Sequence, residues 1–574
     1  MRTITTRRVL TGVLAAVTVF AGVQLTLPAA AATAPGYTIY KAPAELRGAD
    51  DAGEPSIGSN WTTGNAMYQS GLRTYRVGFD AANVATWEDK SSTLTSITSL
   101  DPILYTDNQT NRTFVSQLYG ACSLVAFSDN DGSSWTQNPV GCGAGAAADH
   151  QTVGGGTFAP GPNGVGVGYP DIAYYCAQAI ASAQCSSSND GGLTFNPAVP
   201  IYTALQCGGL HGHIMVAPKD GTAYVPNADC GGKQGVSVST NNGLTWAVRT
   251  VPGSASQGES DPAVGIGSGG AMYLGFQQAA GKDTTPGIAV SRDRGVTFQN
   301  INLNVGQSLG IRNIQFPRVV AGDDNRAAYA FLGTTTGGDD QASGFTGSWN
   351  LYISTTYDGG ATWSTVQATP DSDPVQKGCI WLAGGGNPCR NLLDFMGSTV
   401  DKQGRVLIGY ADGCDDTCAA GGRNNRGAYA SIARQTSGDG LFAAFDGSTG
   451  GGTTPTAGPS PATSPAAGPS PATSPVASPS AAPAATAPGA PTGLSAAPAK
   501  GKGIQLTWSA PGSDGGSAIT GYRVYRDGAL LTTVTGTSHK DTTTTSGRTY
   551  AYEVSAVNAV GEGARSNTAS ATAK

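Results

Sequence analysis

Short apolar runs alternate with small polar and turn-forming residues through most of this chain, a pattern that favours many short strands over long helices. Seven segments open on one or two residues, mostly polar, and continue as an apolar run. They are EPSIG (54–58), DPILY (101–105), DHQTV (149–153), HGHIMV (211–216), DPAVGIG (261–267), FPRVVAG (316–322) and MGSTVD (396–401). Their starts lie 47 to 80 residues apart, which predicts one four-stranded sheet per repeat and therefore a β-propeller. We expect seven blades, with residues 37–42 completing the last sheet; six blades are the alternative if one segment is not an innermost strand.

A second, polar pattern repeats between these runs. Five octapeptides follow the template Ser/Thr, any, Asp/Asn, any, Gly, any, Ser/Thr, aromatic: SDNDGSSW (128–135), SNDGGLTF (188–195), STNNGLTW (239–246), SRDRGVTF (291–298) and TYDGGATW (356–363). The glycine suits a left-handed turn, the acid or amide can cap nearby N–H groups, and the aromatic ring can pack between sheets. We expect a tight turn between the two outer strands of each blade. DAANVATW (80–87) reads as a degenerate copy.

This octapeptide resembles the Asp box, or bacterial neuraminidase repeat, so residues 35–445 resemble the sialidase superfamily of propellers. In that family the boxes lie at the blade periphery, away from the substrate. The resemblance therefore implies structural roles for Asp190, Asp293 and Asp358, and a substrate site elsewhere.

The C-terminal end has a different pattern. Residues 450–489 are almost entirely Pro, Ala, Ser, Thr and Gly, which predicts an extended linker. Alternating apolar positions then return at IQLTW (504–508), YRVYRD (522–527) and YAYEVSAVNAVGEG (550–563). With APTGLSA (490–496) and Trp508, they make residues 490–574 resemble a fibronectin type III domain. That resemblance implies a β-sandwich accessory module without catalytic residues.

Composition and the N-terminus indicate export. Arg2, Arg7 and Arg8 precede an apolar run that is interrupted by polar residues and followed by small ones, so residues 1–32 are predicted to be a signal peptide rather than a stable membrane span. The ten cysteines fall into five close pairs, which predicts local disulfides. A net charge of −6 excludes a basic nucleic-acid surface. We expect a secreted monomer.

Chemistry is expected where the innermost propeller strands begin, because the loops before them face the central channel. Residues uncommon elsewhere in the chain gather there. The candidate catalytic residues are Glu259, Asp261, Glu54, Asp149 and His150; the candidate substrate-binding residues are His211, His213, Arg312, Arg318, Arg390 and Asp394. Several have a plain structural alternative: Asp–Pro and Glu–Pro pairs form turns, and His211 and His213 could be packed histidines.

The sialidase resemblance implies more particular roles. Members use an aspartate acid/base, a tyrosine nucleophile assisted by a glutamate, and three arginines that bind the sugar carboxylate. Glu259 would be that glutamate, and Arg312, Arg318 and Arg390 the arginines. The family's Arg-Ile-Pro sequence is absent from the first blade. No tyrosine is singled out as nucleophile, although Tyr68, Tyr169 and Tyr410 are near the expected channel mouth.

These patterns predict a secreted glycoside hydrolase of sialidase-like, exo-α-sialidase-type fold that acts on glycans or polysaccharides. A polysaccharide lyase with a histidine base is one alternative, and a non-catalytic glycan- or protein-binding propeller is another. No cofactor is expected. Calcium held by Asp412, Asp415 and Asp416 is an alternative to a solvated disulfide loop at that place.

Overall fold

The computed structural model describes residues 32–97, 101–119, 122–140, 149–161, 164–178, 182–208, 210–256, 260–415, 418–421, 426–446, 487–499, 502–511, 513–514, 519–558 and 561–574. The predicted signal peptide, apart from its last residue, lies outside these residues, as does most of the linker. The chain divides into two compact units, one before and one after residue 457. Within the described ranges, no helix has the length and apolar character needed to cross a bilayer.

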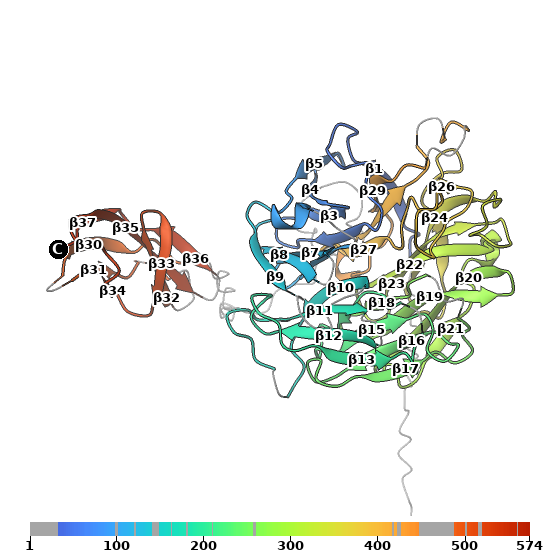
Figure 1. The fold of residues 1–574 in the computed structure, drawn as a ribbon, viewed down its shortest axis with the longest axis horizontal. Helices are drawn as coiled ribbons and strands as arrows, with labels where there is room; N and C mark the ends of the chain where they lie inside the picture. Colours follow the sequence, from blue (N-terminus) through green and yellow to red (C-terminus); the bar gives the residue numbers. More distant parts are fainter. Residues whose placement is uncertain are drawn as a thin grey trace, which may run out of the picture. The chain divides into compact units, whose positions relative to one another are not determined.

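The first unit consists of seven antiparallel sheets, six with four strands and one with a short fifth strand, which are the blades of a propeller (Figure 1). The strands of the first four blades are Ser56–Ser59 (β2), Ala66–Ser70 (β3), Arg73–Phe79 (β4) and Ala85–Asp89 (β5); Pro102–Thr106 (β6), Thr113–Tyr119 (β7), Cys122–Ser128 (β8) and Thr136–Val140 (β9); Asp149–Gly156 (β10), Ile172–Gln178 (β11), Ser182–Ser188 (β12) and Val199–Thr203 (β13); and Met215–Val216 (β14), Ala223–Asn227 (β15), Gly235–Ser239 (β16) and Ala247–Thr250 (β17).

The remaining blades have the same order. Their strands are Ala263–Ile266 (β18), Met272–Ala280 (β19), Asp283–Ser291 (β20) and Gln299–Asn302 (β21); Asn313–Ala321 (β22), Ala327–Thr334 (β23), Ser348–Thr356 (β24), Ser364–Gln367 (β25) and the added Gln376–Lys377 (β26); and Gly397–Val400 (β27), Val406–Asp412 (β28), Tyr429–Ser437 (β29) and Gly36–Lys41 (β1). Three short 3-10 turns, Leu94–Ser96 (η1), Gln307–Leu309 (η2) and Ala443–Phe445 (η3), complete the unit.

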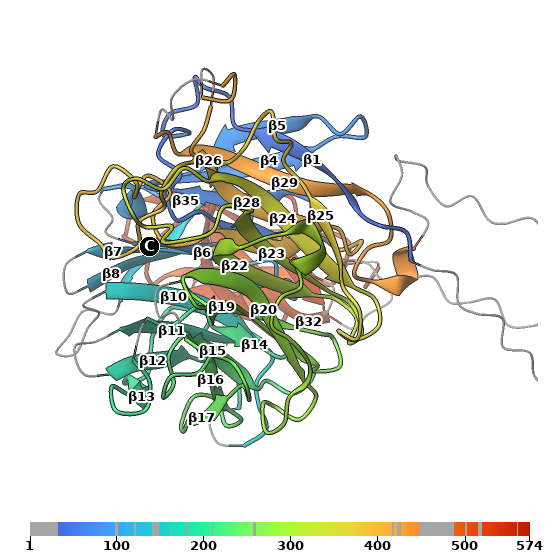
Figure 2. The ribbon, with the colours of Figure 1, turned by 90° about the vertical axis from the view of Figure 1, so that its right-hand side faces the viewer.

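The ring of blades is closed. Each innermost strand contacts the innermost strand of the next blade, and β27 contacts β2. The last sheet is completed by β1, which pairs antiparallel with β29 in the register Tyr40↔Ile432. In Figures 1 and 2 the blue N-terminal strand accordingly lies beside the orange strands from residues 397–437. The predicted seven blades, and their completion by residues 37–42, are confirmed.

The five octapeptides form the same turn between the third and fourth strands of blades two to six. In SNDGGLTF the Ser188 Oγ accepts the N–H of Gly192 at 2.8 Å, and the Asp190 Oδ1 accepts the N–H of Thr194 at 2.9 Å. The other four copies repeat both bonds. The template glycine is left-handed in every copy, with φ between 74° and 93°. Each template aromatic is half-buried against a core cluster.

Apolar side chains fill the spaces between blades, and buried tyrosines link neighbouring sheets. The Tyr68 hydroxyl donates to the Tyr410 carbonyl at 2.9 Å, and the Tyr329 hydroxyl donates to the Phe276 carbonyl at 2.9 Å. A buried hydroxyl needs such a partner because its desolvation is otherwise uncompensated. These bonds help to fix the position of one blade against the next.

The second unit is a two-sheet sandwich. One sheet has the order β30-β31-β34, and the other has the order β33-β32-β35-β36 with β37 paired to β35. The strands are Thr492–Pro498 (β30), Ile504–Ser509 (β31), Ile519–Arg526 (β32), Ala529–Val534 (β33), Ser538–Asp541 (β34), Thr549–Asn558 (β35), Glu562–Arg565 (β36) and Ala569–Thr572 (β37). Trp508 packs edge-on against Tyr522 in its core, with ring centroids 5.7 Å apart.

Four of the five predicted cysteine pairs are disulfides. They join Cys176 to Cys185, Cys207 to Cys230, Cys379 to Cys389 and Cys414 to Cys418. The fifth pair includes Cys142, which lies outside the described residues. Such local disulfides are typical of proteins that mature outside the reducing cytosol.

Candidate functional site

The segments that precede the innermost strands bring a polar cluster to the propeller axis. We call the side on which these strands begin the start face, and the opposite side the end face. The cluster, here called the axial cluster, comprises Glu54, Asp101, His150, His211, Asp261, Arg390 and Asp394. Glu54, Asp101, His150, His211 and Asp261 are each less than 5% exposed. Within the part of the chain that the structure describes, these five side chains are therefore shielded from water, which strengthens their electrostatic interactions.

The ionisation of Glu54 is disfavoured by its surroundings. Burial raises its pKa well above its usual range, and the neighbouring carboxylates of Asp101 and Asp394 raise it further. Its backbone is held in the left-handed region at φ 56°. Among the described residues, its Oε2 is buried without a hydrogen-bond partner. These conditions favour a protonated acid that retains one unused oxygen.

Asp394 lies beside this acid in a pair with Arg390. Arg390 forms a two-bond pair with it, donating from Nη2 to Oδ2 at 2.6 Å and from Nη1 to Oδ1. The Arg390 Nη1 also donates to the Leu382 carbonyl at 3.1 Å. A forked pair of this kind fixes the orientation of a carboxylate.

His150 and Asp261 form a second pair. The His150 Nε2 lies 2.7 Å from the Asp261 Oδ2. Burial lowers the pKa of His150, but the charge and hydrogen bond of Asp261 outweigh it and raise that pKa to about 10. His211 packs edge-on against His150, with centroids 5.3 Å apart; burial and this neighbour lower the pKa of His211 to about 4. One histidine is therefore charged and the other neutral near pH 7.

His213 and Arg318 lie next to this cluster but face the central channel. The Arg318 Nη2 donates to the His213 Nε2 at 3.4 Å, and its Nε donates to the Met396 carbonyl. Burial, and then the charge of Arg318, lower the pKa of His213 well below its usual range. Phe395 lies between His213 and the axial cluster. Its ring centroid is 4.6 Å from that of His213 and 6.3 Å from that of His150.

Other predicted residues do not join this group. Arg312 is 57% exposed at its side chain and pairs with Asp283 at 2.7 Å, so the three arginines do not assemble as a clamp. Arg312 immediately precedes β22, which begins three residues before the predicted segment FPRVVAG. Tyr68 and Tyr410 are fully buried and hydrogen-bonded between blades, not placed at the channel mouth. Glu259 lies outside the described residues; for Asp149 the structure describes the backbone, in β10, but not the side chain.

The central channel itself holds a cavity of about 580 Å³. All seven innermost strands line it, mostly with aliphatic side chains. His213 and Arg318 stand at its inner end, nearest the start face. Its exposed lining residues, including Gln109, Pro218, Ser268 and Lys402, follow the ends of innermost strands, so the cavity opens on the end face.

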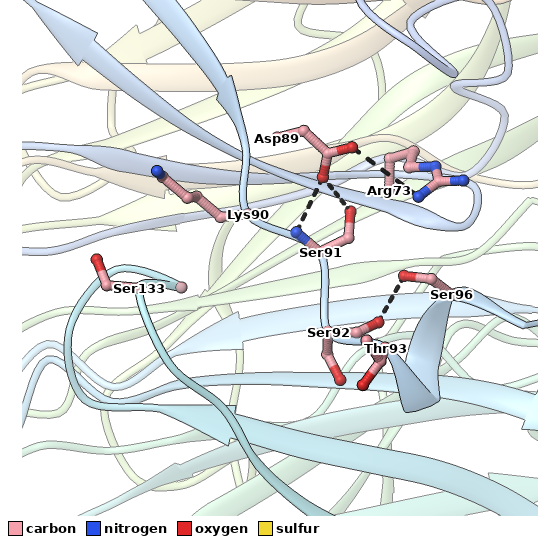
Figure 3. Close-up of a pocket in the computed structure, with 9 residues that line it drawn as sticks. Arg73, Asp89, Lys90, Ser91, Ser92, Thr93, Ser96 and Ser133 are labelled. Atoms are coloured by element: carbon pink, nitrogen blue, oxygen red, sulfur yellow. Dashed lines mark hydrogen bonds and ion pairs between the residues drawn. The ribbon is translucent and has the colours of Figure 1, made fainter.

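A second hollow, of about 450 Å³, lies at the edges of the first two blades and is shown in Figure 3. Its polar groups bind one another: the Asp89 Oδ1 accepts the N–H of Ser91 at 2.9 Å, its Oδ2 lies 3.9 Å from Arg73, and the Ser96 hydroxyl donates to the Ser92 carbonyl at 2.6 Å. Its acid, Asp89, is exposed. We therefore place the candidate site at the axis.

The carboxylates considered for calcium already have a cationic partner. The Lys41 Nζ lies 2.9 Å from Asp412, 2.9 Å from Asp415 and 3.3 Å from Asp373. Burial raises the pKa of Asp412 to about 7, and Lys41 opposes that rise. Asp416 is outside the described residues. Across the described ranges, no group of three or more His, Cys, Asp or Glu side chains has a metal-binding arrangement.

Two residues of the site were missed by sequence reasoning. Gln151 fixes Asp101: its N–H donates to the Asp101 Oδ2 at 2.6 Å, and its side-chain amide donates to the Asp101 carbonyl. Phe395 is the aromatic side chain shared by both histidine environments. Within its segment, NLLDFMGS, it has the pattern of an ordinary core residue, so only the adjacent Asp394 could have drawn attention to it.

Comparison with known proteins identifies the second unit. Residues 489–572 match the fibronectin type III domain family. A titin structure with its kinase and flanking domains is 27% identical over 15% of this chain and 17% of its own, with a TM-score of 0.14. A Fn3-like protein from Clostridium thermocellum is 34% identical over 15% of this chain and 94% of its own, with a TM-score of 0.14.

Over the larger unit, the α-L-arabinanase of Penicillium chrysogenum, solved with arabinobiose, is 11% identical over 70% of this chain and 97% of its own, with a TM-score of 0.35. No curated protein sequence matches the chain. The protein thus combines a seven-bladed β-propeller with a C-terminal fibronectin type III domain.

Proposed function

We propose that this protein is a secreted glycoside hydrolase acting on glycans, with its catalytic centre in the axial cluster. One arrangement carries the proposal: Glu54 is buried beside Asp101 and Asp394, which raises its pKa and favours the protonated acid, and its Oε2 is buried with no hydrogen-bond partner among the described residues. A protonated carboxyl beside ionised carboxylates is the arrangement that glycosidic bond cleavage needs. The repeated octapeptides support the finer proposal of a sialidase-type enzyme.

In this mechanism Glu54 donates its proton to the glycosidic oxygen as the bond to the anomeric carbon breaks. Asp261, oriented by His150, accepts a proton from the water that attacks that carbon. The charge and hydrogen bond of Asp394 raise the pKa of Glu54 and so favour its reprotonation between turnovers, whereas Arg390, which orients Asp394, lowers that pKa. His211, whose Nε2 is buried without a partner among the described residues, is available to bind a sugar hydroxyl.

The test is incubation of the full chain with sialylated glycans and with plant and microbial polysaccharides, with products identified by mass. We expect wild-type protein to release sugars, Glu54→Gln and Asp261→Asn to lose at least about 100-fold in rate, and Arg312→Gln to match wild type. Arg312→Gln is the matched control because its guanidinium pairs with Asp283 instead of joining the cluster. Free sialic acid among the products would support the sialidase type.

A second candidate is a non-catalytic glycan-binding propeller. The low exposure of the axial cluster favours it, because such a cluster can simply seal the start face. That function predicts retained glycan affinity with no product. A lyase would instead give unsaturated products that absorb in the ultraviolet.

A further inference from the structure

Arg318 is an unusual charge in the wall of the central cavity. It is 3% exposed, and its Nη1 is buried without a hydrogen-bond partner among the described residues. Its other nitrogens donate to a carbonyl, that of Met396, and to His213, and neither acceptor carries a negative charge. Burial lowers the pKa of Arg318 to about 10 although the charge of Asp261 opposes that fall, so the guanidinium remains charged at neutral pH. A buried cation without a direct anionic partner is costly, and a bound anion would remove that cost.

The cavity in front of Arg318 is lined mostly by apolar residues, with polar ones that include Thr106, Asp107 and Thr399. Its wall between the inner end and the mouth includes Ile57, Leu104, Val153, Val216, Val264 and Val319. At the mouth Trp61 packs edge-on against Phe442, with centroids 5.6 Å apart. An apolar cavity of this kind holds water poorly and takes up apolar ligands, and about 580 Å³ is within the range of small-molecule sites.

A glycan does not fit this lining, because sugar hydroxyls need many polar partners and the middle of the cavity offers aliphatic side chains. A purely apolar ligand would leave the guanidinium unpaired. We propose that the central cavity binds a monoanionic amphiphile, a long-chain carboxylate whose head pairs with Arg318 and whose hydrocarbon tail extends towards the end face. His213, beside Arg318, would donate the remaining hydrogen bond to the head. This site goes beyond the proposed glycan chemistry and uses the opposite face of the propeller.

The test is calorimetric titration of the full chain with decanoate below its micellar concentration, with decanol and decyltrimethylammonium as neutral and cationic comparators. We expect decanoate to bind at one site, roughly 10- to 100-fold more tightly than decanol, because a hydrogen-bonded charge pair supplies that difference. Equal affinities for decanoate and decanol, tighter binding of the cation, or no saturable decanoate binding would overturn the proposal. These comparisons use wild-type protein and need no variant.

Three variants locate the site. Arg318→Gln should abolish the preference for decanoate while keeping decanol binding, which also reports that the cavity is intact. Ala321→Phe, in the wall towards the mouth, should weaken both ligands by filling the channel. Lys402→Gln, which removes an exposed charge at the mouth, should leave the preference unchanged. A preference that depends on Lys402 and not on Arg318 would contradict the proposed orientation.

Discussion

The His150 Nε2 lies 2.7 Å from the Asp261 Oδ2, and both side chains are almost fully buried at the propeller axis. The two residues are 111 positions apart and belong to the third and fifth blades. Their ion pair therefore depends on ring closure, and it also connects the proposed chemistry to stability. Removing one partner of such a pair leaves a buried charge, which costs about 3–5 kcal/mol.

The pair makes stability dependent on pH in a defined direction. The pKa of His150 is about 10 in the folded protein, compared with an ordinary value of 6.5. Its contribution is therefore fully present below pH 6.5 and is lost as the pH rises towards 10. The wild-type protein should therefore lose free energy of unfolding between pH 6.5 and pH 10. We expect His150→Gln to reduce this loss by roughly 2–4 kcal/mol, measured by urea denaturation at several pH values.

His539 provides the control for that experiment, because it is half-exposed on the second unit. His539→Gln should leave the pH profile of propeller unfolding as it is in wild type. If His150→Gln and wild type lose stability in parallel between pH 6.5 and 10, the ion pair is not formed in solution.

The repeated turns should be sensitive at their glycines. Gly192 has φ 93°, and a Cβ there would lie 2.9 Å from the Phe114 ring. We expect Gly192→Ala to lower the free energy of unfolding by about 1–3 kcal/mol, from backbone strain and displacement of that ring. Thermal unfolding measures the effect. Gly344→Ala is the matched control, because a Cβ at Gly344 would have no atom within 4 Å and the backbone of Gly344 is not left-handed. Equal losses of stability in the two variants would refute this account of the turn.

Lys41 should matter more at high pH than at low pH. It offsets the buried charge of Asp412, whose pKa is about 7. Without the lysine that pKa rises further, so the stability lost on ionising Asp412 grows as the pH increases. We expect Lys41→Met to cost about 1–3 kcal/mol at pH 8 and less at pH 5, by urea denaturation. The exposed Lys219→Met is the control, and a cost that does not change with pH would argue against this ion pair.

Much of the fold was predictable because it repeats. Each blade must bury its apolar faces against two neighbouring blades, so a similar apolar run recurs along the chain. The octapeptides mark the turns between the third and fourth strands of a blade. The closing strand was predictable from the leftover segment at residues 37–42, which needed a sheet edge. The bounds were less predictable: the HGHIMV segment contributes only Met215–Val216 as a strand, with His211 in an isolated bridge to Asn227.

The candidate site was predictable as a set of segments but not as a set of contacts. The rule that inner-strand openings meet at the axis brought Glu54, His150 and Asp261 together. It could not separate His211 from His213, because the irregular segment before β14 sends one ring to His150 and the other to Arg318. Nor could it exclude Arg312, whose exposure depends on an extension of β22 that the sequence pattern does not mark.

The most direct test of the central claim compares leaving groups. With glycosides of the sugar that the wild-type protein releases, a dinitrophenolate leaving group needs no proton, whereas a natural sugar alcohol does. If Glu54 is the general acid, Glu54→Gln will lose at least about 100-fold on the natural glycoside and far less on the dinitrophenyl glycoside. Equal losses on both substrates, or full activity of Glu54→Gln, would contradict the assignment of Glu54 as the acid of this site.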